Sequence, residues 1–145
     1  MKKLFPLLIE NKFQRALVLG TCSYTSADDK GALKWKASII LIKIIGGLSS
    51  WLLSASRLTT DELPGSSFEE FNGLGAFVAS QDVSQIKWTL FRVGFLGNGP
   101  AKPVVASYTG SGKDGMMISR KSIAAWVLNE LGESEFIGKT PSLCN

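Results

Sequence analysis

The chain has 145 residues and a formal net charge of +4, and 45% of its residues are hydrophobic against 19% charged. This composition excludes a disordered or low-complexity protein and predicts a single domain over residues 1–145. The positive excess belongs to no basic cluster, so we expect no nucleic-acid partner. Histidine is absent and the two cysteines form no CxxC pair, which excludes His-based triads and predicts no metal site and a cytoplasmic, reducing location.

The N-terminal segment predicts a short helix followed by a buried strand. Residues 4–13 keep leucines on one helical face, and the apolar run stops at Glu10, too early for an export signal. Residues 15–20, RALVLG, form a continuous apolar run that ends in glycine, which is typical of a strand buried in a parallel sheet. The hydroxyl-rich residues 21–26 follow as a loop at the carboxyl end of this strand.

The next segment contains the longest apolar run. Asp28 or Asp29 is expected to cap a helix that continues into residues 37–55, ASIILIKIIGGLSSWLLSA. This run is nearly as long as the ~20 residues that span a bilayer. Lys43 near its middle and a pair of glycines favour a helix that is buried in the protein or lies at an interface. Membrane contact through this helix is the alternative.

The middle of the chain predicts a helix and a second strand. Overlapping capping boxes at Ser66 and Ser67 predict a helix that ends near Ser80. Residues 88–93, WTLFRV, are a β-rich run, and a glycine-rich loop over residues 94–100 follows them.

The last third predicts two short strands around a helix. Residues 104–108 form one strand, Ser119 caps a helix over residues 120–131, and residues 136–138 add a strand at the edge of the sheet. The apolar face of this helix is expected to hold Ile123, Ala124, Val127, Leu128 and Leu131. Strands that alternate with helices indicate an α/β layer structure.

Three segments resemble a known family in their order and spacing. They are residues 15–36 (RALVLGTCSYTSADDKGALKWK), 86–96 (IKWTLFRVGFL) and 114–145 (DGMMISRKSIAAWVLNELGESEFIGKTPSLCN). The chain resembles the C-terminal half of an atypical short-chain dehydrogenase/reductase of the fungal NmrA-like or flavin-reductase-like type. The resemblance covers essentially the whole chain. It implies an α/β domain with a partial Rossmann-like parallel sheet, flanking helices and NADP or NAD as cofactor.

The sequence departs from the family pattern at the cofactor pyrophosphate. In the family, a first strand leads through a glycine-rich turn into a helix whose N-terminus receives the pyrophosphate, and this N-terminal βαβ motif is missing here. The glycine-rich stretches 97–99 and 110–112 do not lie between a buried strand and a helix start, so we interpret them as surface turns. We therefore expect a truncated domain with weakened or lost cofactor binding, and we assign no catalytic residue.

The resemblance places the remaining cofactor site at the carboxyl ends of two strands. It implies that the hydroxyls after the first strand lie beside the nicotinamide, and that backbone groups after the second strand follow its carboxamide. The expected cofactor-binding residues are Gly20, Thr21, Ser23, Tyr24, Val93, Gly94 and Phe95. Local backbone hydrogen bonding by the hydroxyls, and a simple strand end at the glycine, are the alternatives. Trp35 and Trp88 are expected near this cleft.

Two functions follow from these observations. The first is an NAD(P)-binding Rossmann-like protein that acts on a small-molecule substrate. Its missing strands expose a sheet edge, which predicts a homo-oligomer. The alternative is a non-enzymatic interaction or membrane-associated protein that uses the apolar helix 37–55.

Overall fold

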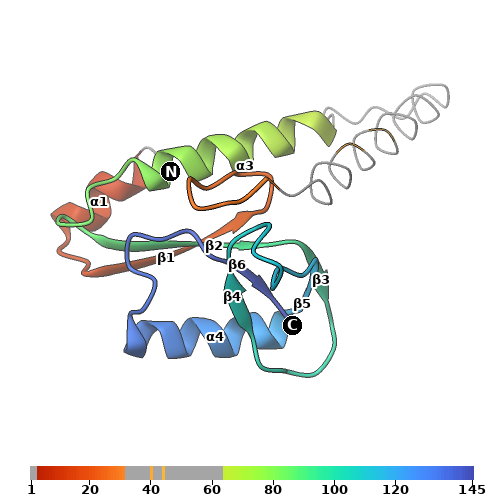
Figure 1. Cartoon of the computed structure of the whole chain (residues 1–145). Coiled ribbons are helices and arrows are strands. Elements are labelled where there is room, and N and C mark those ends of the chain that lie inside the picture. Colours follow the sequence, from red (N-terminus) through yellow and green to blue (C-terminus); the bar gives the residue numbers. More distant parts are fainter. Residues whose placement is uncertain (1–2, 32–39, 41–43, 45–63) are drawn as a thin grey trace, which may run out of the picture.

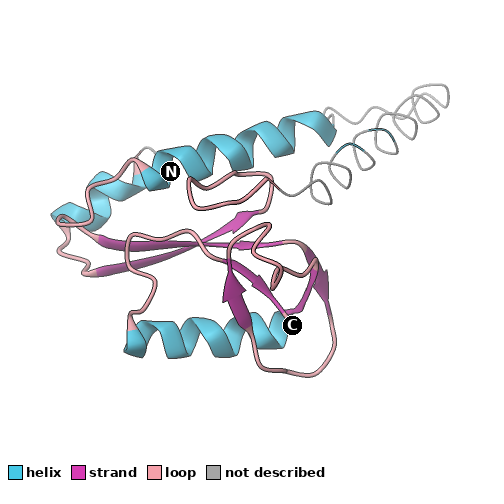
Figure 2. Cartoon of the chain, viewed as in Figure 1, coloured by secondary structure: helices cyan, strands magenta, loops and turns pink. Residues whose placement is uncertain are grey.

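A computed structural model describes residues 3–31, 40, 44 and 64–145. The described elements are α1 (Leu4–Glu10), β1 (Arg15–Thr21), α3 (Pro64–Ala79), β2 (Lys87–Val93), β3 (Phe95–Gly97), β4 (Val105–Ser107), β5 (Met117–Ser119), α4 (Arg120–Glu133) and β6 (Ser142–Cys144). Figures 1 and 2 show three layers, in which α1 and α3 cover one face of the main sheet and α4 lies on the other. The predicted α/β layer structure is confirmed.

The main sheet has four strands in the order β1-β2-β6-β4. Strand β1 pairs with β2 in parallel from Arg15↔Lys87 to Thr21↔Val93, and β2 pairs with β6 in parallel. Strand β4 is antiparallel to β6, so the sheet is mostly rather than wholly parallel. Strands β3 and β5 form a separate parallel pair. The two strands predicted at 15–20 and 88–93 are both confirmed.

The last strand was predicted at the wrong place. Residues 136–138 form a turn, and the C-terminal strand is β6, inside the sheet between β2 and β4. The chain approaches β2 through backbone hydrogen bonds from the Gly138 N–H to the Trp88 carbonyl (2.7 Å) and from the Arg92 N–H to the Pro141 carbonyl (2.8 Å). Gly138 has a φ of +69°, and Pro141 has no N–H to donate, so regular pairing starts after both.

Two further boundaries differ from the predictions. Helix α3 spans Pro64–Ala79, so Ser66 and Ser67 lie within it. Proline suits a first helical turn because its fixed φ is helical and its missing N–H has no partner there. The predicted loop 94–100 contains strand β3, where the Phe95 N–H donates to the Met116 carbonyl at 2.7 Å.

Helix α4 has the predicted cap, and part of its predicted apolar face is confirmed, because Ile123 and Val127 pack against the core. Its Ser119 Oγ accepts the Ser122 N–H at 3.1 Å, as predicted. Leu128 and Leu131, placed in the apolar face by the sequence, are 70% and 50% exposed, whereas Glu130 is 2% exposed. The buried face is shifted toward Ser122 and Glu130 because each of these polar side chains has hydrogen-bond partners inside the protein.

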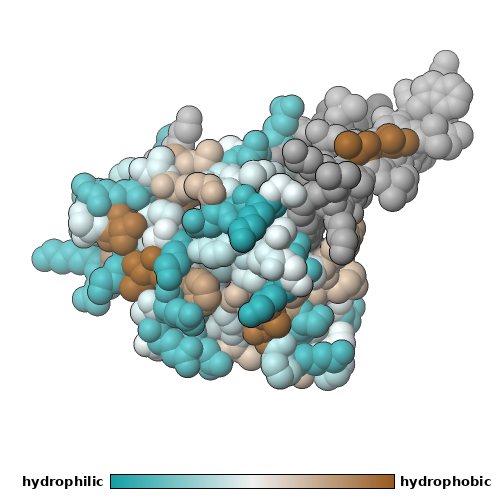
Figure 3. Space-filling view, in the orientation of Figure 1, coloured by the Kyte–Doolittle hydropathy of each residue, from teal (hydrophilic) through white to brown (hydrophobic). Residues whose placement is uncertain are grey.

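The core consists of two clusters, one on each face of the sheet. The cluster on the side of α1 and α3 contains Phe5, Val18, Val78, Ile86, Trp88 and Leu90. Toward α4 lie Phe91, Val93, Ile118 and Leu143, with the half-buried Trp126 and Val127 packed against them. On the face drawn in Figure 3, strongly hydrophobic residues lie in separate spots among hydrophilic ones.

Of the predicted apolar helix 37–55, the structure describes Ile40 and Ile44, which are 57% and 60% exposed. The rest of this segment lies outside the described residues. In the part of the chain that is described, no helix combines the length and apolar character needed to cross a membrane.

Candidate functional site

The carboxyl ends of β1 and β2 lie side by side. Thr21 is in register with Val93, and the Cys22 N–H donates to the Val93 carbonyl at 3.3 Å. Because parallel strands end at the same edge of a sheet, the segments 20–24 and 93–95 are brought together at one edge. This is the edge at which open α/β sheets bind their ligands.

The loop after β1 presents a pair of hydroxyls. Thr21 Oγ1 and Ser23 Oγ lie 2.5 Å apart and share a hydrogen bond, and both side chains are half-buried. Between them in sequence, Cys22 turns toward β6, with its Sγ 3.4 Å from the Ser142 Oγ. Burial raises the pKa of the Cys22 thiol, although the Ser142 hydroxyl and the Arg92 charge partly oppose this. The thiol is therefore protonated at neutral pH and is a poor nucleophile.

Tyr24 lies against α3. A Cβ atom on Gly75 would be 2.3 Å from the Tyr24 Cγ, so only glycine allows this approach of the ring to the helix backbone. The ring packs on the core cluster beneath α3. Similarly, a Cβ atom on Gly20 would lie 3.0 Å from a Leu90 methyl group. Tyr24 and Gly20 therefore position the loop through packing.

The segment after β2 carries an exposed apolar pair. Gly94 is half-buried, and the next residue, Phe95, is 46% exposed. Phe95 is in register with Met117 of β5, which is 54% exposed. The edge thus combines hydroxyls from the β1 loop with an aromatic ring and a thioether from the β3–β5 pair.

An ion pair between Arg92 and Asp29 lies behind this edge. Arg92 is fully buried, and its Nη1 and Nη2 donate to Asp29 Oδ2 and Oδ1 at 2.6 and 2.8 Å. This pair was not predicted from the sequence. An arginine in the middle of the buried run WTLFRV signals it, because a buried charge requires a partner.

The remaining hydrogen bonds of this pair reach three other segments. Arg92 Nε donates to the Thr140 carbonyl and Nη1 to the Tyr24 carbonyl, both at 2.9 Å. The Asp29 carboxylate accepts the Ser26 N–H at 2.7 Å and the Thr109 N–H at 2.9 Å. The pair therefore joins β2, the loop after β1, the segment before β5 and the approach to β6.

These bonds correct the expectation that Asp28 or Asp29 caps a helix. Residues 29–31 are not helical, and the Asp29 carboxylate is occupied by Arg92 and two backbone N–H groups. Burial by itself would raise the pKa of Asp29, but the hydrogen bonds and charge of Arg92, with the Ser26 and Thr109 N–H groups, hold it below its ordinary value. Asp29 is therefore ionised at neutral pH.

Trp88 does not lie at this edge. It sits near the amino end of β2, is 4% exposed, and donates its indole N–H to the Gln81 carbonyl at 2.9 Å. The expectation that it lines the cleft is wrong, because Trp88 is a residue of the core. Trp35 lies outside the described residues. Among the residues that are described, no three acidic or cysteine side chains gather as metal ligands do.

Comparisons with known proteins support the fold. No protein-family profile and no curated protein matches the chain. Among solved structures, it is similar to a short-chain dehydrogenase/reductase (wide type) from Veillonella parvula DSM 2008 in complex with NADP, with a TM-score of 0.63 and 14% identity over 98% of this chain and 55% of that chain. An ethylated short-chain dehydrogenase/reductase from the same organism matches with the same values. The chain has a short-chain dehydrogenase/reductase-like fold and spans about half the length of these proteins.

The substitution Asp29→Asn tests the ion pair. At pH 7 it leaves the buried Arg92 guanidinium without its counter-charge, and we expect the free energy of unfolding to fall by about 3–5 kcal/mol. Urea denaturation monitored by tryptophan fluorescence measures this change. Glu69→Gln, at an exposed site on α3, is the matched control and should change stability by less than about 0.5 kcal/mol.

The difference in unfolding free energy between the natural chain and Asp29→Asn should depend on pH. Because folding lowers the pKa of Asp29, its ionisation stabilises the native state fully above the unfolded-state value of about 3.9, and this stabilisation disappears as the pH falls through the lower native value. The stability difference between the natural chain and Asp29→Asn should therefore shrink below about pH 4. A difference that is small at pH 7, or that grows on acidification, contradicts the assignment.

Proposed function

We propose that the edge formed by the carboxyl ends of β1 and β2 is the nicotinamide side of an NAD(P) site, in a protein of the atypical, NmrA-like reductase type. The observation that carries this proposal is the parallel register that ends at Thr21↔Val93. It brings the Thr21–Ser23 hydroxyl pair and the Gly94–Phe95 segment to one edge of a fold that is similar to an NADP-bound dehydrogenase/reductase.

The residues at this edge fit the nicotinamide end of such a cofactor. A carboxamide needs hydrogen-bond donors and acceptors, which the two hydroxyls and the backbone after β2 provide. A flat ring needs an apolar surface, which the exposed Phe95 provides. When bound, the cofactor would supply hydride transfer, while Thr21, Ser23 and Gly94 would position it.

Binding by this chain alone is proposed to be weak. Pyrophosphate binding requires backbone N–H groups at the start of a helix. Within the described residues, the strand that leads directly into a helix is β5, and its junction with α4 is Ser119–Arg120, without glycine. Gly110 and Gly112 have positive φ values of +79° and +82° but lie in the turn before β5. The affinity for NAD(P) therefore depends on contacts with the nicotinamide end of the cofactor.

Titration with NADPH tests the proposed site. We expect saturable NMR shifts of the backbone amides of Thr21, Ser23 and Gly94 at millimolar ligand. The double substitution Thr21→Val, Ser23→Ala removes two hydrogen-bonding hydroxyls and should weaken binding about 3–10-fold. Ser84→Ala, in the loop before the amino end of β2, is the control and should not change the affinity. Absence of shifts in a folded sample contradicts the proposal.

The free edge of β1 supports a second proposal, that copies of this chain self-associate through the sheet. Strand β1 is the end strand of the described sheet. Its Leu19 is 46% exposed, and Phe13 just before it is 54% exposed. An end strand presents unpaired backbone N–H and carbonyl groups that pair readily with another strand. An exposed apolar side chain beside such an edge favours the same contact.

Sedimentation at micromolar concentration tests this association. We expect oligomers for the natural chain and a shift toward monomer for Leu19→Lys, because a lysine on an edge strand opposes edge-to-edge pairing. Leu7→Lys, at an exposed leucine of α1 (51% exposed), is the matched control and should leave the oligomer unchanged. A monomeric natural chain, or an equal effect of both substitutions, rules out association through β1.

A further inference from the structure

A cavity of about 450 Å³ lies between α4 and the segment that leads into β4. Its lining includes Val104 and Ala106 on the sheet side and Trp126 on α4, and it extends to Phe136 after the helix. None of the residues at the β1–β2 edge contributes to it. Strand β4 is also at the opposite end of the sheet order from β1. The cavity is therefore separate from the proposed nicotinamide site.

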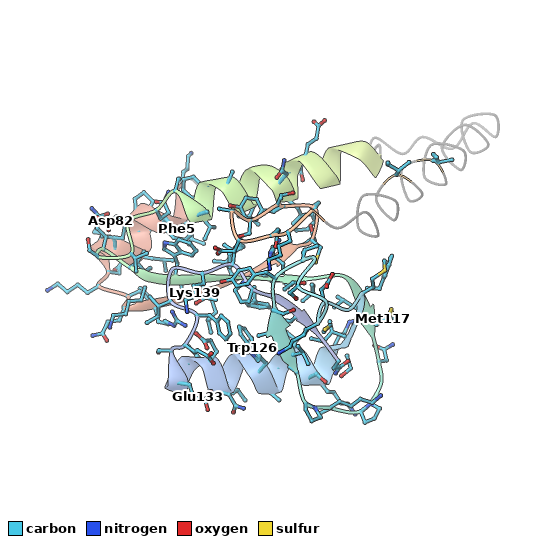
Figure 4. All side chains as sticks on the ribbon, in the orientation of Figure 1. Phe5, Asp82, Met117, Trp126, Glu133 and Lys139 are labelled. Carbon is cyan, nitrogen blue, oxygen red and sulfur yellow. The ribbon has the colours of Figure 1, made fainter. Side chains whose placement is uncertain are left out.

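Aromatic rings form one part of the cavity wall. The rings of Trp126 and Phe136 lie 5.9 Å apart with their planes tilted by 50°. Trp126 also contacts Phe91 of β2, at 5.5 Å between ring centroids, which fixes its position against the sheet. In Figure 4, Trp126 stands between α4 and the sheet. Such rings bind flat apolar groups and attract cations to their faces. Lys139 Nζ already lies 5.6 Å from the Phe136 ring centroid.

Glu130 gives the cavity a buried acceptor. Its side chain is 2% exposed and lines the cavity. Glu130 Oε1 accepts a hydrogen bond from the Arg15 guanidinium and another from the Phe136 N–H at 2.8 Å. No described residue donates to the second oxygen, Oε2. Oε2 is not one of the fully buried polar atoms that lack a partner among the described residues, so it can accept a hydrogen bond from a group that enters the cavity.

The other charges in the lining leave an acidic excess. Arg15 neutralises Glu130. Glu133 and Glu135 also line the cavity, and neither carboxylate has a hydrogen bond or ion pair with another described residue, whereas Lys102 is the one cation in the lining. In Figure 4, Glu133 lies at the end of α4 away from β5. The lining thus holds two exposed carboxylates and one exposed ammonium group, and the ammonium group of Lys139, outside the lining, lies over the Phe136 ring.

We propose that this cavity binds a small planar organic cation of the amidinium or guanidinium class. The flat apolar part of such a ligand would pack on Trp126 and Phe136, and its N–H groups would reach Glu130 Oε2 and the carboxylates of Glu133 and Glu135. Planar N–H donors in a fork match carboxylate oxygens in pairs. The cavity volume is within the range of roughly 300–1,000 Å³ that small-ligand sites occupy.

Benzamidine is the probe, and benzamide, its neutral isostere, is the ligand control. Binding is followed by NMR at the Trp126 indole N–H, a signal identified by its loss in Trp126→Phe. We expect saturable shifts with benzamidine and at least about tenfold weaker binding of benzamide, which lacks the charge.

The double substitution Glu133→Gln, Glu135→Gln should weaken benzamidine binding by about tenfold or more, because it removes both unpaired charges and keeps the side-chain shape. Glu69→Gln, Glu70→Gln makes the same change in charge at exposed positions of α3 and should leave the affinity as it is. Three outcomes overturn the proposal: no shift of the Trp126 signal, equal binding of benzamide, or equal effects of the two double substitutions.

Discussion

The ion pair between Arg92 and Asp29 is the interaction on which the candidate site depends. Taking a guanidinium and a carboxylate out of water is unfavourable by several kcal/mol per ion unless close geometry and further hydrogen bonds compensate. Here the two groups meet at 2.6 and 2.8 Å, and backbone groups of Tyr24, Thr140, Ser26 and Thr109 provide the other bonds. Such a network is complete only when all four segments are in place.

This requirement explains how the irregular segments around the sheet edge are held. The loop after β1 has little regular structure, yet its Tyr24 carbonyl and Asp29 side chain are both fixed to β2 through Arg92. The segment before β5 is fixed to the same loop by the Lys30 N–H, which donates to the Thr109 carbonyl at 2.9 Å. Gly110 permits this contact, because a Cβ atom there would lie 2.1 Å from the Lys30 carbonyl oxygen. The hydroxyls of Thr21 and Ser23 are thus displayed from a fixed loop.

Features with a local cause could be predicted from the sequence, and features with a distant cause could not. Residues 15–20 are a strand because apolar residues follow each other there, and residues 88–93 because they are rich in residues that favour strands. Ser119 caps α4 because its hydroxyl reaches an N–H three residues on. Asp29 has the local pattern of a helix cap, but its partner lies 63 positions away.

In the candidate sites, too, features with a local cause could be predicted and features with a distant cause could not. The segments 20–24 and 93–95 meet, as predicted, because β1 and β2 pair in parallel. Their binding of a cofactor stays a prediction. The position of β6 could not be predicted, because it depends on how Gly138 and Pro141 bring the chain back to β2. The cavity beside α4 follows from the same return of the chain, which places Phe136 against Trp126. The burial of Glu130 on α4 could not be predicted, because Glu130 is held by Arg15, 115 positions earlier.

The most direct test of this account is the pH titration of the Asp29 carboxyl carbon by NMR in the natural chain. We expect this carbon to titrate below the value of about 3.9 that is typical of a free aspartate, and the Arg92 guanidinium protons to exchange slowly with water. An Asp29 that titrates at or above that value, together with rapidly exchanging Arg92 protons, would contradict the claim that this pair holds the site together.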